Sequence, residues 1–263
     1  MSKAALRLRP ANPEPSPCKL CGGASRLFGV TDFNRNCEEA RGKFLPLSGV
    51  AVYYRRCEAC GLVYSEAFDD WAPEDFETHI YNAAYADVDG DYEAIRPASN
   101  AQMIVRAFGA SANNLAVLDY GGGNGDFARA LVEAGFRQAA TYDAFHPDHR
   151  LRPEIDYDLI TCFETLEHMP DPLAGAADIA GFLKPDGMVF FSTLTQPADF
   201  ATLGMQWWYI GPRNGHVTLH SRQSLAILWA RHGLKVASFN DNFHAAFRTV
   251  PAFASHLIRT QMS

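Results

Sequence analysis

A run of alternating glycines follows an acidic residue near the middle of the chain. The pattern D-x-G-x-G-x-G begins at Asp119 and places glycine at 121, 123 and 125. Glycines let the backbone turn sharply and let a ligand approach without meeting a Cβ, and the N-terminus of a following helix favours an anionic group. The pattern therefore predicts a nucleotide cradle. The alternative is an ordinary tight turn between a strand and a helix.

The same residues narrow the kind of nucleotide. A dinucleotide fingerprint would place its third glycine at Asp126, and the chain contains no G-x-x-x-x-G-K-[ST] phosphate loop. Asp143 lies 18 residues after Gly125, where a carboxylate ending a second strand accepts hydrogen bonds from two ribose hydroxyls. Ala144 and Phe145 come next and are predicted to line the adenine slot. A helix cap is the alternative role for Asp143.

Four cysteines form a second chemical pattern. Cys18 and Cys21 make one C-x-x-C-G knuckle, and Cys57 and Cys60 make another after 35 intervening residues. Two such knuckles supply four thiolates, the ligand set of a structural tetrahedral zinc site, and a closed site of this kind leaves no coordination position for catalysis. Disulfides are the weaker alternative because no secretory signal precedes the knuckles. The remaining cysteines, Cys37 and Cys162, are interpreted as buried or incidental thiols.

The elements that must position these residues alternate between strands and helices. Only 14 residues separate Asp143 from Asp158, so one α/β unit must be abbreviated. The sequence predicts an α/β fold, a Rossmann-like doubly wound sheet, with a small N-terminal β module around strands 50–57 and 61–64. The other expected strands are 115–119, 139–143, 157–164, 188–193 and an antiparallel hairpin of 236–239 and 243–247, and helices are expected after 126, 171 and 221.

Taken together, the motifs resemble a known family. The glycine pattern resembles motif I of class I S-adenosylmethionine (SAM) dependent methyltransferases, and YDLITCFETLEHMPDP, starting at Tyr157, is similar to their ubiquinone-biosynthesis branch. The cysteine knuckles resemble the zinc ribbons of sugar and natural-product methyltransferases. The resemblance implies SAM and a structural Zn²⁺ as cofactors. The SAM contacts it implies are Asp119, Tyr120, Gly121, Gly123, Gly125, Asp143, Ala144, Phe145, Phe163 and Tyr85.

The implied domain order has four parts. Residues 1–17 are predicted to be a flexible leader, 18–66 the zinc-ribbon module, 67–98 linker or lid helices, and 99–263 the SAM-binding methyltransferase domain. The chain ends soon after this last domain, unlike longer members of the family, so acceptor identity does not follow from the resemblance.

Methyl transfer to a hydroxyl or an acidic carbon also requires loss of a proton. Histidine suits this task because its pKa lies near neutrality. His168 and His216 are the candidate bases, and Glu167 is a candidate to orient a histidine or to face the pocket. Structural hydrogen bonding is the alternative for each of the three. Aromatic residues around two segments are candidate acceptor contacts, with packing as the alternative: Tyr81, Trp207, Trp208, Tyr209 and His220.

Composition limits the partners and the location. The 263 residues carry a net charge of −7, which disfavours a nucleic-acid substrate. No apolar run reaches the ~18 residues of a membrane span, so the expected location is the cytoplasm. The predicted activity is SAM-dependent methyl transfer to a small molecule, most simply a sugar, nucleotide-sugar or glycan precursor. The alternatives are an RNA-modifying methyltransferase that uses the ribbon to hold nucleic acid, and a catalytically silent scaffold.

Overall fold

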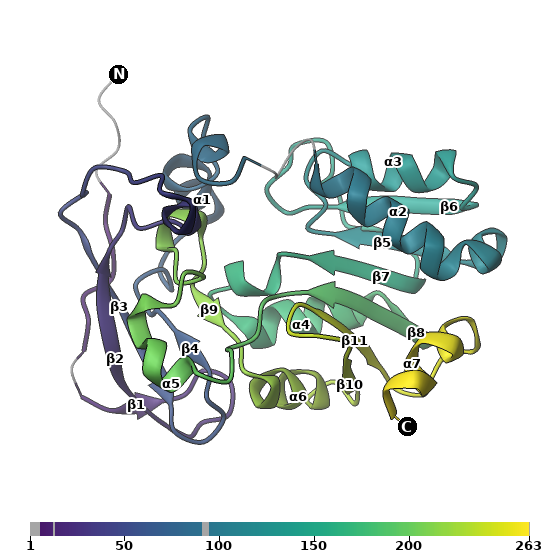
Figure 1. Cartoon of the computed structure of the whole chain (residues 1–263). Helices are drawn as coiled ribbons and strands as arrows, with labels where there is room; N and C mark the ends of the chain where they lie inside the picture. Colours follow the sequence, from purple (N-terminus) through teal and green to yellow (C-terminus); the bar gives the residue numbers. More distant parts are fainter. Residues whose placement is uncertain (1–5, 13, 91–94, 263) are drawn as a thin grey trace. The chain divides into compact units, whose positions relative to one another are not determined.

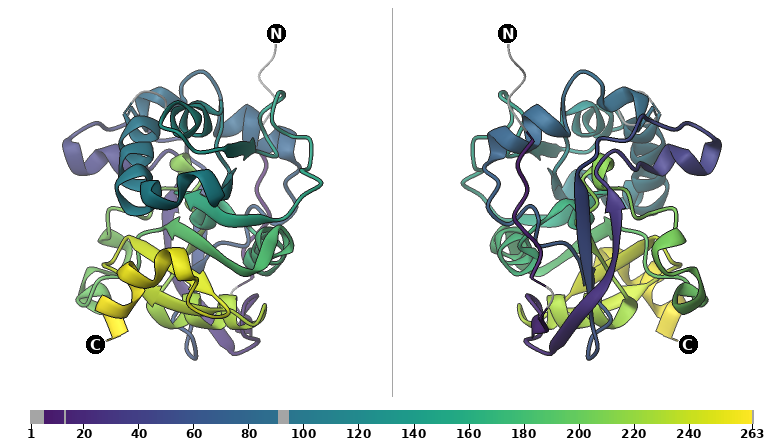
Figure 2. Two further views of the ribbon diagram at one scale, coloured as in Figure 1. Left: turned by 90° about the vertical axis from the view of Figure 1, so that its right-hand side faces the viewer. Right: turned by 90° about the vertical axis from the view of Figure 1, so that its left-hand side faces the viewer.

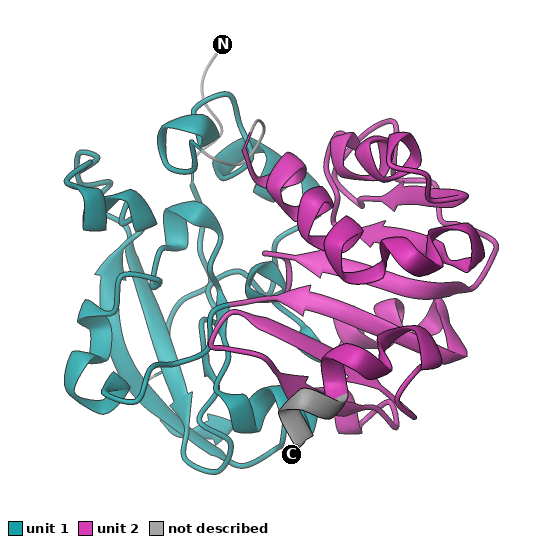
Figure 3. Ribbon diagram, turned by 45° about the vertical axis from the view of Figure 1, so that its right-hand side comes forward, with its two compact units in different colours: residues 1–90, 167–173, 194–227 teal, residues 91–166, 174–193, 228–263 magenta. Residues whose placement is uncertain are grey.

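The computed structural model describes residues 6–12, 14–90 and 95–262. The chain divides into two compact units that alternate along the sequence (Figure 3). Unit 1 comprises Met1–Gly90, Glu167–Leu173 and Leu194–Ile227, and unit 2 comprises Asp91–Leu166, Ala174–Thr193 and Leu228–Ser263. The predicted domain of residues 99–263 therefore differs from the observed division, because 167–173 and 194–227 fold with the N-terminal residues.

Unit 2 is built on a mixed sheet with the strand order β10-β11-β8-β7-β5-β6 in the described part of the chain (Figure 1). The four strands β6, β5, β7 and β8 run parallel, and β11 and β10 add an antiparallel hairpin at one edge, as the sequence predicted. The strands are β5 (Ala116–Tyr120), β6 (Gln138–Tyr142), β7 (Tyr157–Phe163), β8 (Leu183–Ser192), β10 (Lys235–Ser238) and β11 (Phe243–Phe247). This arrangement confirms the predicted Rossmann-like fold class.

Helices cover both faces of this sheet. Alternate residues of a strand point to opposite faces, and neighbours in β8 show this: Phe190 joins a core cluster with α2, α3 and α7, whereas the Phe191 ring lies 5.4 Å from that of Trp229 in α6. Asp178 of α4 accepts a hydrogen bond from Tyr120 of β5. The helices are α2 (Arg96–Phe108), α3 (Asp126–Glu133), α4 (Pro172–Gly181), α6 (Arg222–Ala230) and α7 (Ser255–Met262), with 3₁₀ turns η3 (Gly109–Asn114), η4 (Leu166–His168) and η7 (Ala252–Ala254).

Unit 1 contains an antiparallel sheet in the order β1-β2-β3-β4-β9 in its described residues. The strands are β1 (Ser16–Pro17), β2 (Ala24–Asp32), β3 (Ala51–Cys57), β4 (Val63–Tyr64) and β9 (Thr218–Leu219). The right-hand view of Figure 2 shows the long antiparallel pair β2 and β3. The sequence predicted β3 and β4. It missed β2, whose alternation is broken by a register shift between Leu27 and Gly29, and β9, which pairs with a distant part of the chain.

Aromatic side chains fill the core of unit 1. Tyr54, Phe68 and Ile80 are among the fully buried members. Short helices surround this core: η1 (Cys37–Arg41), α1 (Pro73–His79), η2 (Tyr85–Asp87), α5 (Phe200–Leu203), η5 (Gly204–Gln206) and η6 (Pro212–Asn214). Within the described residues, no helix combines the length and the apolar character needed to cross a bilayer.

Described residues of the predicted flexible leader contact the rest of unit 1. Leu6 and Leu8 pack against the core of unit 1. The Arg9 amide donates to Ala67 O at 3.0 Å, and Trp71 Nε1 donates to Arg7 O at 2.9 Å. Proline removes only its own N–H, so a proline-rich segment still packs where its apolar side chains find a core. Residues 1–5 and 13 lie outside the described part.

Candidate functional site

The glycine loop joins β5 to α3 at the carboxyl end of the unit 2 sheet. Gly121, Gly123 and Gly125 have φ values of 74°, 55° and 78°, which L-residues rarely adopt. A Cβ at Gly121 would lie 2.6 Å from Thr165 Oγ1, and one at Gly122 would lie 2.0 Å from Asp119 Oδ2. The loop therefore requires glycine on both conformational and steric grounds, which is more than an ordinary turn demands.

Asp143 ties the end of β6 to this loop. Its Oδ2 accepts a hydrogen bond from Gly123 N at 2.8 Å, and its Oδ1 accepts from Phe145 N at 2.8 Å and His146 N at 3.2 Å. A carboxylate offers about four acceptor positions, so Oδ2 keeps capacity for a further donor. The carboxylate closes a turn after β6 and does not cap a helix. An aspartate that fixes a glycine loop and still accepts a hydrogen bond fits the ribose end of an adenosyl group.

Asp119 lies beneath the loop and is 4% exposed. Its Oδ1 accepts a hydrogen bond from Thr161 Oγ1 at 3.0 Å. Burial raises the pKa of Asp119 to about 7, with a further upward contribution from the charge of Asp143. The close approach of Gly122 and this burial give Asp119 a supporting position under the loop.

We expect the titration of Asp119 to appear in the stability of the protein. The ordinary carboxyl pKa of 3.8 rises to about 7 on folding. The folded state therefore binds the proton more tightly than the unfolded chain, and the destabilising effect of ionisation grows from about pH 4 to about pH 7 and is complete above that. Relative to Asp119→Asn, the free energy of unfolding of the wild type should fall across this window by up to about 4 kcal/mol.

Urea denaturation of both proteins at pH 5, 6, 7 and 8 measures this difference. Comparing the slopes with pH cancels the constant cost of burying an amide in the variant. Parallel curves for the two proteins would show that Asp119 keeps an ordinary pKa.

The other predicted SAM contacts lie at several places. Tyr120 Oη donates to Asp178 Oδ2 at 2.8 Å. Phe163 ends β7, and its ring lies 5.7 Å from that of Phe127. Ala144 and Phe145 are exposed in the turn after Asp143. Tyr85 belongs to unit 1, where its hydroxyl lies 3.4 Å from Asn214 O.

Glu164 was missed by the sequence reasoning. It follows Phe163 at the carboxyl end of β7 and has φ +47°, among the described residues the only positive φ outside glycine. Ser192 Oγ donates to Glu164 Oε1 at 2.6 Å, and Glu164 N donates to Ser192 Oγ at 2.9 Å. Strained residues gather at ligand sites, and the crevice at the carboxyl ends of neighbouring strands is where α/β sheets bind ligands. The available sequence signal was its position as the last residue of the predicted strand 157–164.

In unit 1, Tyr209 orients two of the predicted catalytic residues. Its Oη donates to Glu167 Oε1 at 2.6 Å, and its carbonyl oxygen lies 2.8 Å from His216 Nδ1. A carbonyl only accepts, so Nδ1 carries a hydrogen, and in the neutral imidazole the lone pair is then on Nε2. Glu167 is fully buried, and its Oε1 lies 4.0 Å from His168 Nε2. The fold thus brings together Glu167, His168, His216 and Tyr209.

Two neighbouring features keep these side chains in place. Tyr54 of β3 donates through its hydroxyl to His216 O at 2.8 Å. A Cβ at Gly215 would lie 2.9 Å from His168 Nδ1, so glycine leaves room for this imidazole. The His168 and His216 rings are 5.0 Å apart. The arrangement presents two imidazoles and a carboxylate within one small volume.

The predicted acceptor residues have different environments within unit 1. The Tyr81 ring lies 6.1 Å from that of His168. Trp207 is buried in the core, whereas Trp208 is 47% exposed. His220 is buried with Nδ1 3.3 Å from Ser224 Oγ. Tyr81 and Tyr209 therefore lie next to the candidate histidines. Trp207 packs in the core, which is the alternative to acceptor contact given above.

The four knuckle cysteines converge in unit 1, with their sulfur atoms all within 4.8 Å of one another. Cys18 Sγ lies 3.8 Å from Cys60 Sγ, and Cys21 Sγ lies 3.5 Å from Cys57 Sγ. Four thiolates at 2.3 Å from a tetrahedral zinc would be about 3.8 Å apart. Gly22 and Gly61 have φ 76° and 74°. The donor set and its spacing fit a zinc ion.

The remaining cysteines lie outside this cluster. Cys37 Sγ is 3.6 Å from His216 Nδ1, and Cys162 is buried in β7. None of the six cysteines, all of which lie among the described residues, is in a disulfide.

Comparisons with known proteins bear on residues 92–238, which match a family model described as a methyltransferase domain. A ubiquinone biosynthesis O-methyltransferase of Hydrogenovibrio crunogenus is 33% identical over 109 residues, 33% of this chain and 45% of that protein. The enzyme of the same description from Vibrio campbellii is 49% identical over 49 residues, 19% of this chain and 21% of that protein. The chain thus spans less than half the length of these curated relatives.

Solved structures of low sequence identity are also similar. An O-methyltransferase family protein from Burkholderia thailandensis is 14% identical with a TM-score of 0.47. The match covers 67% of this chain and 63% of that protein's chain. The 1,6-didemethyltoxoflavin-N1-methyltransferase of the same organism is 16% identical with a TM-score of 0.47. This match covers 76% of this chain and 94% of the chain of that enzyme.

Proposed function

Since this chain belongs to the methyltransferase-domain family, we propose that it transfers a methyl group from SAM to a small-molecule acceptor. The observation that supports the proposal is the hydrogen bond from the Gly123 amide to Asp143, which joins the glycine loop to the carboxylate that we propose binds the ribose. SAM would supply a methyl group bound to a positively charged sulfur. In an in-line displacement the acceptor bonds to the methyl carbon, and the sulfur leaves as the neutral thioether of S-adenosylhomocysteine. The glycine loop and Asp143 would hold its adenosyl part.

The acceptor side of the reaction is assigned to Glu167, His168 and His216. His216 Nε2 carries the lone pair that a general base needs, because Nδ1 is committed to the Tyr209 carbonyl. Tyr209 also holds the Glu167 carboxylate, whose negative charge would stabilise the imidazolium that forms when the base takes the proton of the acceptor. His216 is therefore the proposed base, with His168 as the second candidate. Tyr85 as a contact to the methionine carboxylate stays a prediction.

We propose a hydroxyl or carbon of a sugar or related biosynthetic metabolite as the acceptor, nucleotide-sugars included. The names of the matched relatives, ubiquinone biosynthesis O-methyltransferases, favour the hydroxyl. The net charge of −7 gives no support to nucleic acid as the acceptor. The cytoplasmic location stays a prediction from the sequence.

Two measurements test this proposal. Calorimetry with S-adenosylhomocysteine (SAH), the product form of the cofactor, should show one site per chain. Transfer of tritiated methyl from SAM should then label a member of a panel of nucleotide-sugars, free sugars and hydroxylated aromatic acids. Absence of SAH binding would favour the scaffold alternative, and labelling of bulk tRNA without any small molecule would favour the RNA alternative.

We also propose that the four-cysteine cluster holds one structural zinc. The purified chain should contain one zinc per molecule by elemental analysis, and Cys57→Ser/Cys60→Ser should lose it because only two thiolates remain. Small metal-bound modules draw much of their folding free energy from the metal, so the variant should also melt at a lower temperature. Cys162→Ser is the matched control and should retain the zinc. A metal-free native protein would contradict the assignment.

A further inference from the structure

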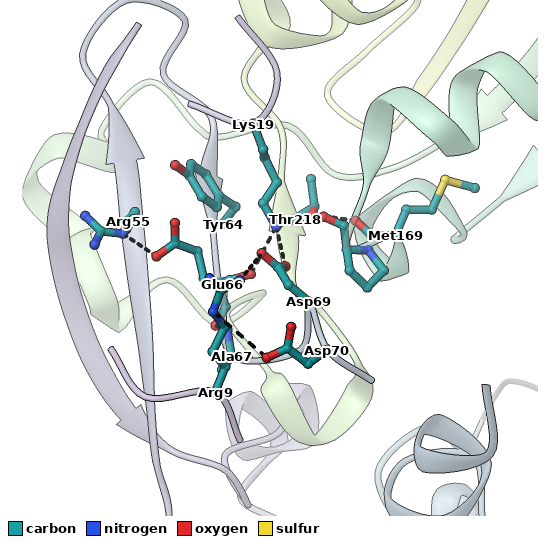
Figure 4. A network of polar contacts seen from close by, with 12 residues as sticks. Arg9, Lys19, Arg55, Tyr64, Glu66, Ala67, Asp69, Asp70, Met169 and Thr218 are labelled. Atoms are coloured by element: carbon teal, nitrogen blue, oxygen red, sulfur yellow. Dashed lines mark hydrogen bonds and ion pairs between the residues drawn. The ribbon is translucent and has the colours of Figure 1, made fainter. Parts of the chain in front are cut away.

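A lysine inside the first cysteine knuckle extends from the metal cluster to the segment that carries Glu167 and His168. Lys19 stands between Cys18 and Cys21. Its Nζ donates to Pro170 O at 2.7 Å, to Asp69 Oδ1 at 2.7 Å and to Ser65 O at 3.4 Å (Figure 4). The side chain is only 17% exposed. Lysine side chains are mostly exposed, so this shielded geometry calls for a reason.

The Pro170 carbonyl belongs to Glu167–Leu173, a segment of unit 1. Two other carbonyls of this segment are held by groups at or next to β9. Thr218 Oγ1 donates to Met169 O at 2.6 Å (Figure 4). Val217 N donates to Glu167 O at 2.9 Å. Lys19 supplies the corresponding bond from the cysteine knuckle. The backbone on both sides of His168 is thus hydrogen-bonded, by residues at or next to β9 and by Lys19 of the cysteine knuckle.

The charges around Lys19 favour this placement. The ammonium is paired with Asp69 and lies 5.0 Å from the centre of the Tyr64 ring. Hydrogen bonds from a charged donor are stronger than neutral ones, and a shielded site strengthens them further. Arg9 joins the same network through Asp69 at 3.7 Å and Asp70 at 4.0 Å. Two cations, Arg9 and Lys19, therefore lie at the Asp69 carboxylate, and of the two it is Lys19 that also bonds the Glu167–Leu173 segment.

We propose that Lys19 is a positioning residue that links the zinc-bound cysteine knuckle to the Glu167–Leu173 segment and so holds His168 in place. The backbone of Lys19 is fixed when Cys18 and Cys21 share a metal ion. Loss of the metal frees this backbone, and the ammonium then no longer holds Pro170 O. The link itself is independent of the proposed function, whereas its effect on catalysis rests on that function.

Hydrogen–deuterium exchange of the full zinc-loaded chain tests the link. In Lys19→Met, which keeps most of the aliphatic stem, the peptide containing residues 166–173 should exchange roughly tenfold faster because a charge-assisted bond is lost. Zinc content and exchange of β3 should stay unchanged. Arg9→Met, the matched control, removes the other cation on Asp69 and should leave the 166–173 peptide as in the wild type. Unchanged exchange of this peptide in Lys19→Met would overturn the proposal.

Hydrogen–deuterium exchange after zinc removal tests whether the metal and Lys19 act on the segment through the same link. Depletion with a chelator should speed exchange of the 166–173 peptide in the wild type, and Lys19→Met should add nothing further, because both changes break one link. Additive effects would refute the coupling to the metal. The zinc-loaded comparison decides whether Lys19 holds the segment even if the depleted chain unfolds.

Catalysis supplies a separate readout. With an acceptor labelled in the tritium assay, Lys19→Met should lower kcat by about tenfold, as loss of a supporting residue typically does, and leave the Kd of SAH unchanged. Equal loss of kcat in Arg9→Met would indicate general damage to the network and contradict a specific role. An inactive wild type would defeat the proposed function alone, since the exchange result does not depend on turnover.

Discussion

His216→Asn is expected to lower kcat by about 100- to 1,000-fold while the Kd of SAH stays within about twofold. The amide nitrogen of asparagine can replace His216 Nδ1 as donor to the Tyr209 carbonyl, which now lies 2.8 Å from it. The lone pair of Nε2 has no counterpart in asparagine. The variant therefore removes the proposed base and keeps the hydrogen bond that positions residue 216.

Companion variants separate chemistry from packing. His216→Ala removes the donor as well and should lose both turnover and thermal stability. His256→Ala changes an imidazole of unit 2 that lies outside both groups of candidate residues and should turn over at the wild-type rate. If His216→Asn turned over at the wild-type rate with the best acceptor of the panel, His216 would be structural and His168 would become the leading candidate base.

The local patterns predicted from the sequence are those whose physical cause is local. The glycines before α3 need positive φ wherever the rest of the chain lies, and the knuckle cysteines need only a tight turn to meet a metal ion. The positions of most strands of unit 2 along the chain also followed from periodicity, since strands buried between helices read as apolar runs. These features were confirmed because few distant contacts are needed to produce them.

The features that the sequence did not predict depend on distant contacts. β9 pairs with β4, so Thr218 lies beside Tyr64 although over 150 residues separate them in the chain. Residues 194–227 fold with the N-terminal residues for this reason. Trp207 was predicted to contact an acceptor because aromatic residues gather in an insertion, yet it packs in the core of unit 1. Residue type alone does not distinguish an aromatic side chain in a core from one in a pocket.

Two residues of the proposed site gave almost no sequence signal. Lys19 is distinguished by the Pro170 carbonyl that its ammonium reaches, and Glu164 by a backbone angle and a bond to Ser192. Both depend on partners far along the chain. Asp143 differs from them, because its spacing from the glycine pattern predicted a contact with the cofactor, and the structure adds the bond through which it acts on the loop.

Asp143→Ala should weaken SAH binding at least tenfold, or about 1.4 kcal/mol or more. The variant removes acceptors for Gly123 N, Phe145 N and His146 N, and it removes the carboxylate proposed to bind the ribose. Calorimetry with SAH measures the loss. Asp148→Ala changes an exposed acid in the following turn and should keep the wild-type affinity. An unchanged Kd in Asp143→Ala would remove Asp143 from the site.

The contribution of the ribose can be separated from that of the loop with a SAH analogue that lacks the 2′ and 3′ hydroxyls. If Asp143 binds these hydroxyls, the losses caused by the variant and by the analogue should not add, because each removes the same interaction. Asp143→Asn extends the comparison, since its amide oxygen can still accept from Gly123 N. Full additivity would assign Asp143 to the loop alone. The ribose would then need another acceptor, and Glu164, the residue after β7, is a carboxylate that offers the same chemistry.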